Sequence, residues 1–250
     1  DSIRSQLYKI LFKPDKNALE YKAVVLAAKQ SQQAPLTLLQ KAGAIRSAYD
    51  FHWQRFLFEH FPKGTGFPSL VPPALPSDLP VAKVQAYSID DSLTTEIDDA
   101  LSLQGLGSGT VVLGIHIAAP ALALQPGDAI DQVARQRLST VYMPGHKITM
   151  LPENWIAAFS LDAGGYRPAV SIYFDVDADF NVSAPVCKIE AVNIVENLRI
   201  QAIEPHFNAQ SGLDAEGAAL FAHHRDLIWF YQLAIARQKA RGKYEPERAA

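Results

Sequence analysis

Apolar residues recur at helical spacing in the first part of the chain. The segment Ala18–Gln32 has this period, Pro35 suits the first position of a second helix that stops at Gly43, and Ala48–Phe61 forms a third. We therefore predict an all-helical domain over residues 1–61. Its order of helices fits either a helix-turn-helix unit or a generic three-helix packing module.

Residues 62–80 have the composition of a linker. They hold six prolines and two glycines. Proline at this density blocks both helices and central strands and favours an extended, semi-rigid chain. We expect a domain boundary in this segment.

After the linker the apolar period changes to two, which predicts strands interrupted by helices. The predicted strands are Val81–Asp90, Ala100–Leu106, Val111–Ala118, Ala169–Val176 and Val182–Val195, and the predicted helices are Asp128–Leu138 and Glu216–Arg241, the latter either one long helix or a broken pair. The fold class is therefore α+β, with a mixed α/β domain over residues 81–250 preceded by a small all-helical domain.

Composition narrows the class of protein. The chain has 250 residues, of which 48% are hydrophobic, but the apolar runs are too short to cross a bilayer, so we expect no membrane partner. Its single cysteine, Cys187, cannot form an internal disulfide, and we expect a reducing, cytoplasmic location. The net charge is −3, yet residues 62–222 hold eighteen acidic against eight basic residues.

Part of that acidity lies in one short stretch between two predicted strands. Asp90, Asp91, Glu96, Asp98 and Asp99 fall within ten residues that contain no Lys or Arg. Carboxylates at this density raise each other's pKa unless a cation lies between them. Their oxygens are hard ligands that suit Mg²⁺ or Mn²⁺, and phosphodiester hydrolysis uses such sites.

The acidic stretch has three other interpretations. An EF-hand loop is excluded, because neither the glycine at position six nor the glutamate at position twelve is present. A solvated acidic loop and a carboxylate pair for glycoside hydrolysis both remain compatible with the spacing.

The motifs that follow resemble a known family. Asp90 to Ala100 is followed in order by Gly-Ile-His-Ile-Ala at 114–118, Ser-Thr-Val-Tyr-Met-Pro at 139–144, Ile-Thr-Met-Leu-Pro-Glu at 148–153 and Arg-Pro-Ala-Val-Ser at 167–171. This series, from about Tyr87 to about Arg241, is similar to the front half of the catalytic RNB domain of RNase II/RNase R exoribonucleases. The resemblance implies hydrolysis of single-stranded RNA from its 3′ end, with release of nucleoside 5′-monophosphates and dependence on Mg²⁺, or alternatively Mn²⁺.

The resemblance also implies roles for individual residues. Asp90 and Asp99 match the first and last metal ligands of the family's acidic motif, and Asp98 matches the aspartate most closely tied to hydrolysis. Glu96 lies where the family usually has Asp, and can still bind metal with a longer reach. Tyr142 matches the tyrosine that stacks on the terminal base. His116 and the aromatic cluster Trp229–Tyr231 are expected to be core residues.

The sequence also departs from the family pattern. Residues 1–61 look helical where the family has β-rich modules, and Ala119 replaces an Asp. We expect the chain to be a fragment, or one of two chains, whose remaining polypeptide supplies the second half of the catalytic domain and an OB-fold module. Two alternatives stay open: a catalytically degenerate RNA-binding or regulatory protein of the same fold, and a DNA-binding regulator that uses residues 1–61.

Overall fold

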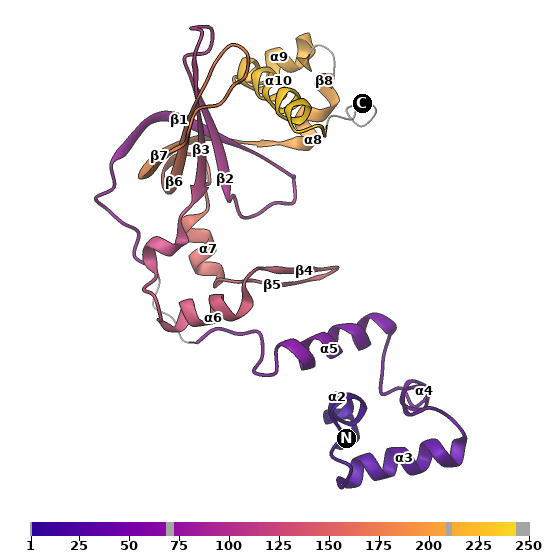
Figure 1. Cartoon of the computed structure of the whole chain (residues 1–250). Helices are drawn as coiled ribbons and strands as arrows, with labels where there is room; N and C mark the ends of the chain where they lie inside the picture. The colour runs from indigo at the N-terminus through magenta and orange to yellow at the C-terminus, as the bar shows by residue number, and fades with distance from the viewer. Residues whose placement is uncertain (1, 69–72, 209–211, 244–250) are drawn as a thin grey trace. The chain divides into compact units, whose positions relative to one another are not determined.

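The computed structural model describes residues 2–68, 73–208 and 212–243. It divides the chain into two compact units, Asp1–Gly66 and Phe67–Ala250. The division lies within the proline-rich segment where we expected a boundary, and among the described residues from 62 to 80 no helix or strand is present. Figure 1 shows the helices and strands of both units.

The first unit is helical, as the apolar period predicts. It contains α1 (Ser2–Ser5), α2 (Leu7–Phe12), α3 (Leu19–Ser31), α4 (Pro35–Lys41) and α5 (Ala48–His60). Pro35 begins α4, and the Ser47 hydroxyl caps α5 by accepting a 3.0 Å hydrogen bond from the Asp50 amide. The core of this unit consists of Leu7, Ile10, Val24, Leu39, Ile45 and Phe51. The helix-turn-helix interpretation stays a prediction.

The second unit is built on a five-stranded closed barrel in the order β1-β2-β3-β6-β7. Its strands are β1 (Val81–Asp90), β2 (Asp99–Gln104), β3 (Val111–Ala118), β6 (Gly165–Val176) and β7 (Val186–Arg199). Neighbouring strands are antiparallel except β1 and β7, which close the barrel in parallel. The mixed α/β class is confirmed, while β7 begins and ends four residues later than the strand Val182–Val195 that we predicted.

The barrel interior combines small apolar side chains with a buried histidine. Ala86, Ala100, Ala169, Val192 and Ile194 are fully buried. His116 is also fully buried, with hydrogen bonds of 2.8 Å to the hydroxyls of Ser102 and Ser171. A buried imidazole with both ring nitrogens bonded is structurally satisfied, so the prediction that His116 is a core residue is confirmed.

Gly114 makes room for this histidine. A Cβ at that position would lie 2.4 Å from the Ser102 hydroxyl and 2.8 Å from His116 Nε2. The glycine is therefore required by the close approach of the two polar side chains.

The segment between β3 and β6 folds into small elements at one end of the barrel. They are η1 (Pro120–Ala123), α6 (Ala129–Arg137), the hairpin β4 (Val141–Met143) and β5 (His146–Ile148), and α7 (Glu153–Phe159). Ile130 and Ala134 of α6 pack with Trp155 and Phe159 of α7 in a separate core cluster. The sequence predicted α6 but neither the hairpin nor α7.

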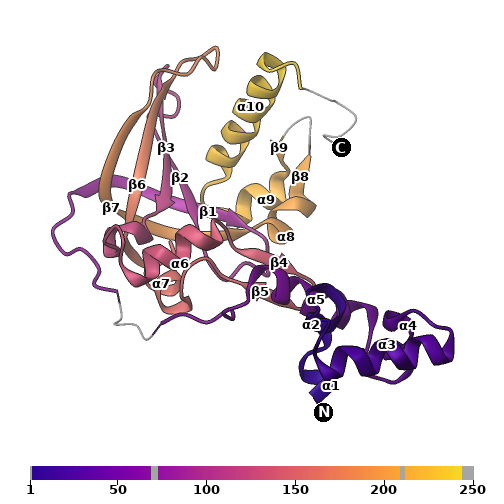
Figure 2. The same cartoon turned by 60° about the horizontal axis from the view of Figure 1, so that its bottom comes forward.

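The chain after β7 crosses to the side of the barrel. It forms α8 (Ile200–Ile203), η2 (Glu204–His206), β8 (Phe207–Asn208), β9 (Gly212–Leu213), α9 (Ala215–Leu220) and α10 (His224–Ala240). Of our two alternatives for Glu216–Arg241, the broken pair is therefore the one observed. Helix α10 lies beside the barrel in both views (Figure 1 and Figure 2).

Helix α10 packs through apolar and aromatic residues. Leu227 lies in one cluster with Tyr87, and Leu233 lies in another with Leu113 and Val176. From the helix, Trp229 contacts Phe180 and Tyr231 contacts Phe207. All three aromatic side chains of the cluster are half-buried, and Trp229 and Phe230 pack against the core without being fully enclosed by it. None of the helices in the described ranges is long and apolar enough to span a membrane.

Candidate active site

The barrel brings the two ends of the acidic stretch to one edge. Asp90 is the last residue of β1 and Asp99 the first of β2, and these strands are antiparallel neighbours with Tyr87 opposite Leu101. Asp98 is held at the same edge, because its carbonyl accepts a 2.8 Å hydrogen bond from the Ala118 amide at the end of β3. The residues predicted as catalytic thus come from two adjacent strands and the loop between them.

Asp91 stabilises this loop. Its carboxylate accepts hydrogen bonds of 2.9 Å from the Leu93 amide and 2.6 Å from the Gln201 side chain. The Leu93 amide, and then Gln201, lower the pKa of this exposed carboxyl. Arg199 donates to the carbonyls of Asp91 and Thr94, at 2.9 and 3.2 Å. Asp91 therefore stabilises the loop between β1 and β2 through its own hydrogen bonds.

Asp90 is supported by Ser88 on its own strand, and Ser88 is in turn held by Asn197 on β7. The buried Ser88 hydroxyl donates a 2.5 Å hydrogen bond to Asp90 Oδ2, and Asn197 on β7 donates to the same hydroxyl at 2.9 Å. These two hydrogen bonds orient the Asp90 carboxylate at the end of the barrel.

Asp98 and Asp99 lie in a field of negative charge. Burial raises the pKa of Asp98 most, and Glu96, Asp99 and Asp90 raise it further. Burial and the charge of Asp90 also raise the pKa of Asp99. Mutual repulsion of this kind requires that the carboxylates lie near one another, and it is relieved by a cation.

Glu96 is engaged by a lysine from the hairpin. Lys147 Nζ donates a hydrogen bond to Glu96 Oε1 and forms an ion pair with it. Both side chains keep part of their surface exposed to solvent, at 31% for Lys147 and 24% for Glu96. Local sequence carries no signal for this contact, because Lys147 lies 51 residues further along the chain than Glu96, on a hairpin that we did not predict.

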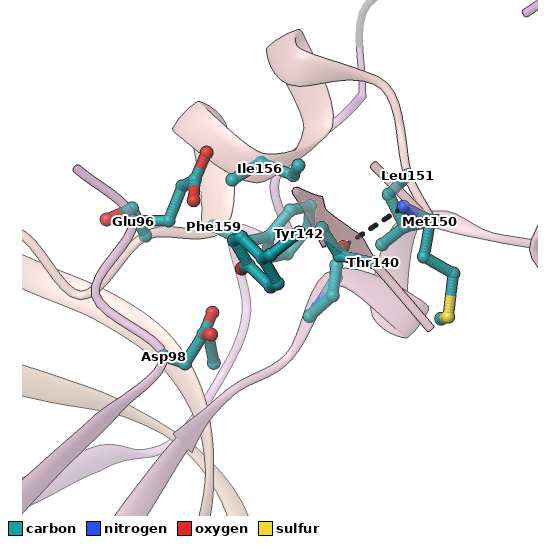
Figure 3. A pocket seen from close by; sticks show the side chains of 11 residues that line it. Glu96, Asp98, Thr140, Tyr142, Met150, Leu151, Ile156 and Phe159 are labelled. Carbon is teal, nitrogen blue, oxygen red and sulfur yellow. Dashed lines mark hydrogen bonds between the residues drawn. The ribbon is translucent and has the colours of Figure 1, made fainter. Parts of the chain in front are cut away.

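A pocket of about 190 Å³ opens beside these carboxylates. Glu96 and Asp98 line it together with Tyr142, Thr140 and apolar residues of the following segment. Figure 3 shows the Tyr142 ring between the two acidic side chains and Met150. Tyr142 is 72% exposed and lies on β4, so an aromatic face is available beside the acidic cluster.

The hairpin that carries Tyr142 has a recognisable sequence signal. Val141-Tyr-Met and His146-Lys-Ile flank Pro144-Gly145, and Gly145 adopts φ of 77° in the turn. Short β-prone segments around Pro-Gly are typical of hairpins.

The donor set has the chemistry that a divalent cation requires. Asp90, Asp98 and Asp99 supply hard oxygen ligands, and the raised pKa values of Asp98 and Asp99 mark a site that favours positive charge. In the described part of the chain, however, no three His, Cys, Asp or Glu side chains are already arranged to hold an ion. A bound ion would therefore have to draw the three aspartates together.

The chain resembles curated proteins over part of its length. It is 37% identical over 123 residues to DIS3-like exonuclease 2 and to an inactive exonuclease DIS3L2, both of Arabidopsis thaliana, covering 44% of this chain and 11% of each relative. It is 36% identical over 118 residues to exoribonuclease 2 of Vibrio parahaemolyticus, covering 47% of this chain and 18% of that protein. The chain thus spans less than a fifth of these relatives.

Solved structures share its fold. The Dss1 exoribonuclease of Candida glabrata superposes with a TM-score of 0.68 at 16% identity, over 96% of this chain and 34% of that one. Yeast Ssd1, a pseudonuclease, superposes with a TM-score of 0.55 at 19% identity, over 64% of this chain and 22% of Ssd1. Mycoplasma genitalium RNase R in complex with ribose-methylated single-stranded RNA superposes with a TM-score of 0.52 at 20% identity. The match covers 64% of this chain and 25% of the RNase R chain.

A family model extends this likeness over most of the second unit. The RNB domain matches residues 80–245, which include the whole barrel, the acidic stretch and the hairpin. The expected resemblance to RNase II and RNase R is confirmed, and the chain belongs to the RNB domain family.

Proposed function

We propose that this chain is part of a 3′-to-5′ exoribonuclease that hydrolyses single-stranded RNA to nucleoside 5′-monophosphates. The observation that carries this proposal is the gathering of Asp90, Asp98 and Asp99 at one barrel edge, beside a pocket lined by the exposed ring of Tyr142. RNA as the partner is supported by the RNase R relative, whose structure contains single-stranded RNA.

The aspartates are the residues that would hold Mg²⁺ or Mn²⁺, with Glu96 as a fourth candidate ligand. When bound, such an ion lowers the pKa of a water molecule and stabilises charge on the scissile phosphate. Ser88 and Asn197 keep Asp90 oriented for this role through the hydrogen bonds described above.

Tyr142 is suited to bind the terminal base. Its ring is exposed and lines the same pocket as Asp98. Stacking tolerates every base, because each has a π-face, so this contact would position the RNA end without reading its sequence. The remaining polypeptide of a longer protein would contribute the rest of the RNA path.

A catalytically degenerate RNA-binding protein is the second candidate. Two relatives are named an inactive exonuclease and a pseudonuclease. In this chain Glu96 is already paired with Lys147. Such a protein would bind RNA through Tyr142 without hydrolysing it.

The test is a degradation assay on 5′-labelled single-stranded RNA with the full-length protein. We expect stepwise shortening from the 3′ end with Mg²⁺, release of nucleoside 5′-monophosphates, and arrest by EDTA. Asp98→Asn should abolish hydrolysis and leave RNA binding intact. Binding without any metal-dependent loss of RNA would instead favour the degenerate protein.

A further inference from the structure

A lysine lies within the acidic cluster. In the β4–β5 hairpin Lys147 is directly opposite Tyr142. Directly opposed residues of an antiparallel pair present their side chains on the same face. The hairpin thus brings an aromatic ring and an ammonium group to the carboxylates together.

The Lys147 ammonium places a positive charge beside more than one carboxylate. A lysine ammonium carries a positive charge at neutral pH, and the ion pair holds this charge against the Glu96 carboxylate. Glu96 and Asp98 line the same pocket, so the charge also lies on the side of the site that holds Asp98. The positive charge of Lys147 therefore offsets part of the repulsion at the site.

The ion pair with Lys147 limits the ability of Glu96 to coordinate a metal ion. Its Oε1 accepts a hydrogen bond from Lys147, so that oxygen is not free to coordinate an ion while the pair is intact. The three aspartates are not held in this way by a lysine or arginine side chain in any contact observed within the described residues. Three carboxylates are sufficient for one hexacoordinate ion that keeps some of its water.

We propose that the Lys147 ammonium takes the place of one divalent ion, so that this chain holds a single ion through Asp90, Asp98 and Asp99 while Glu96 anchors the lysine. The inference rests on the proposed function for the metal itself and adds the ion count and the role of Lys147. A lysine supplies a point charge, which can offset negative charge on a phosphate without coordination geometry.

The ion count can be measured without activity. Mn²⁺ bound to the chain of 250 residues is counted by electron paramagnetic resonance in wild type and variants, with circular dichroism to verify folding. We expect one ion in wild type and in Glu96→Gln, and two in Lys147→Met, because Glu96 and Asp98 then lack their cation. Lys83→Met, which removes an exposed ammonium from β1, is the matched control and should keep one ion.

Other results would overturn the inference in distinguishable ways. Two ions in wild type, loss of the ion in Glu96→Gln, or one ion in Lys147→Met would each show that Lys147 does not replace a metal, with the proposed function intact. No bound ion in wild type or any variant would overturn the metal site of the proposed function as well. Lys147→Gln repeats the measurement should the Met variant fail to fold.

Discussion

Asn197 donates a hydrogen bond of 2.9 Å to the hydroxyl of Ser88 across two parallel strands. The same amide donates at 3.0 Å to the Leu161 carbonyl, and its oxygen accepts from the Ala163 amide at 2.8 Å. Asn197 is therefore fixed, and through Ser88 it fixes Asp90. The position of Asp90 therefore depends on Asn197, which lies 109 positions beyond Ser88 in the chain.

Ser88→Ala tests this support. The substitution removes the donor to Asp90 and one partner of Asn197, so we expect a loss of about 1 kcal/mol in unfolding free energy. Loss of such an outer contact weakens metal binding roughly tenfold in comparable sites. Urea denaturation and Mn²⁺ titration measure the two effects.

The exposed Ser5 provides the control for this experiment. Its hydroxyl donates only to the Ser2 carbonyl, within the helical unit. Ser5→Ala should leave Mn²⁺ affinity unchanged. Equal affinities of the Ser88 and wild-type chains would show that Asp90 needs no outer support.

The raised pKa of Asp98 predicts that this residue destabilises the metal-free protein. A folded-state pKa above the unfolded value means that the ionised carboxyl opposes folding at neutral pH, and that the opposition disappears as pH falls through the folded-state pKa. Asp98→Asn should therefore raise the melting temperature at pH 7 in EDTA. The difference from wild type should shrink in acid.

Substitution of Asp128 should change the melting temperature in the opposite direction in the same experiment. It caps α6 by accepting from the Asp131 amide at 2.7 Å, and such bonds lower its pKa. Asp128→Ala should therefore lower the melting temperature at pH 7. A lowered value for Asp98→Asn as well would mean that Asp98 makes a stabilising contact in the absence of metal.

The local sequence pattern was sufficient to predict those elements whose formation depends on their own residues. The alternation in Val81–Asp90 and Val111–Ala118 predicted β1 and β3 with the bounds observed, and the six-proline segment predicted the place where the chain divides. The acidic stretch was found for the same reason, since its five carboxylates fall within ten residues of sequence.

Long-range contacts could not be predicted in this way. The closure of the barrel depends on β1 pairing in parallel with β7, and the ion pair of Glu96 depends on how the β4–β5 hairpin folds back. Nothing local to Glu96 or Lys147 marks either as the partner of the other. The resemblance supplied roles for the aspartates and Tyr142, but it was silent on the lysine.

The buried His116 predicts a pH dependence of stability. Burial lowers its pKa to about 4, and Glu190 opposes the shift. The unfolded chain takes up a proton near pH 6.5 while the folded chain does not, so stability is present above that pH and declines as pH falls from about 6.5 to about 4. The decline attributable to this group is on the order of 3 kcal/mol.

The contribution of His116 is separated from that of other titrating groups by comparing how steeply the unfolding free energy changes with pH in wild type and variant. Unfolding free energy of wild type and His116→Gln is measured by urea denaturation at several pH values across that window. The variant should be less stable overall but should show a shallower decline. His52→Gln, at an exposed position in α5, is the control and should keep the wild-type slope.

Tyr142 should contribute to RNA affinity with little effect on the fold. Because its ring is 72% exposed, Tyr142→Ala removes few packing contacts, and loss of a base stack should weaken binding by about 1–3 kcal/mol. Tyr142→Phe keeps the π-face and should bind like wild type. Fluorescence anisotropy with a short labelled single strand measures this, and Tyr166→Ala, a change at a tyrosine 57% exposed on β6, is the control. If Tyr142→Ala and Tyr166→Ala bound RNA equally well, the aromatic face beside Asp98 would have no role in holding the strand, and the pocket would lose its assignment as the site of the RNA end.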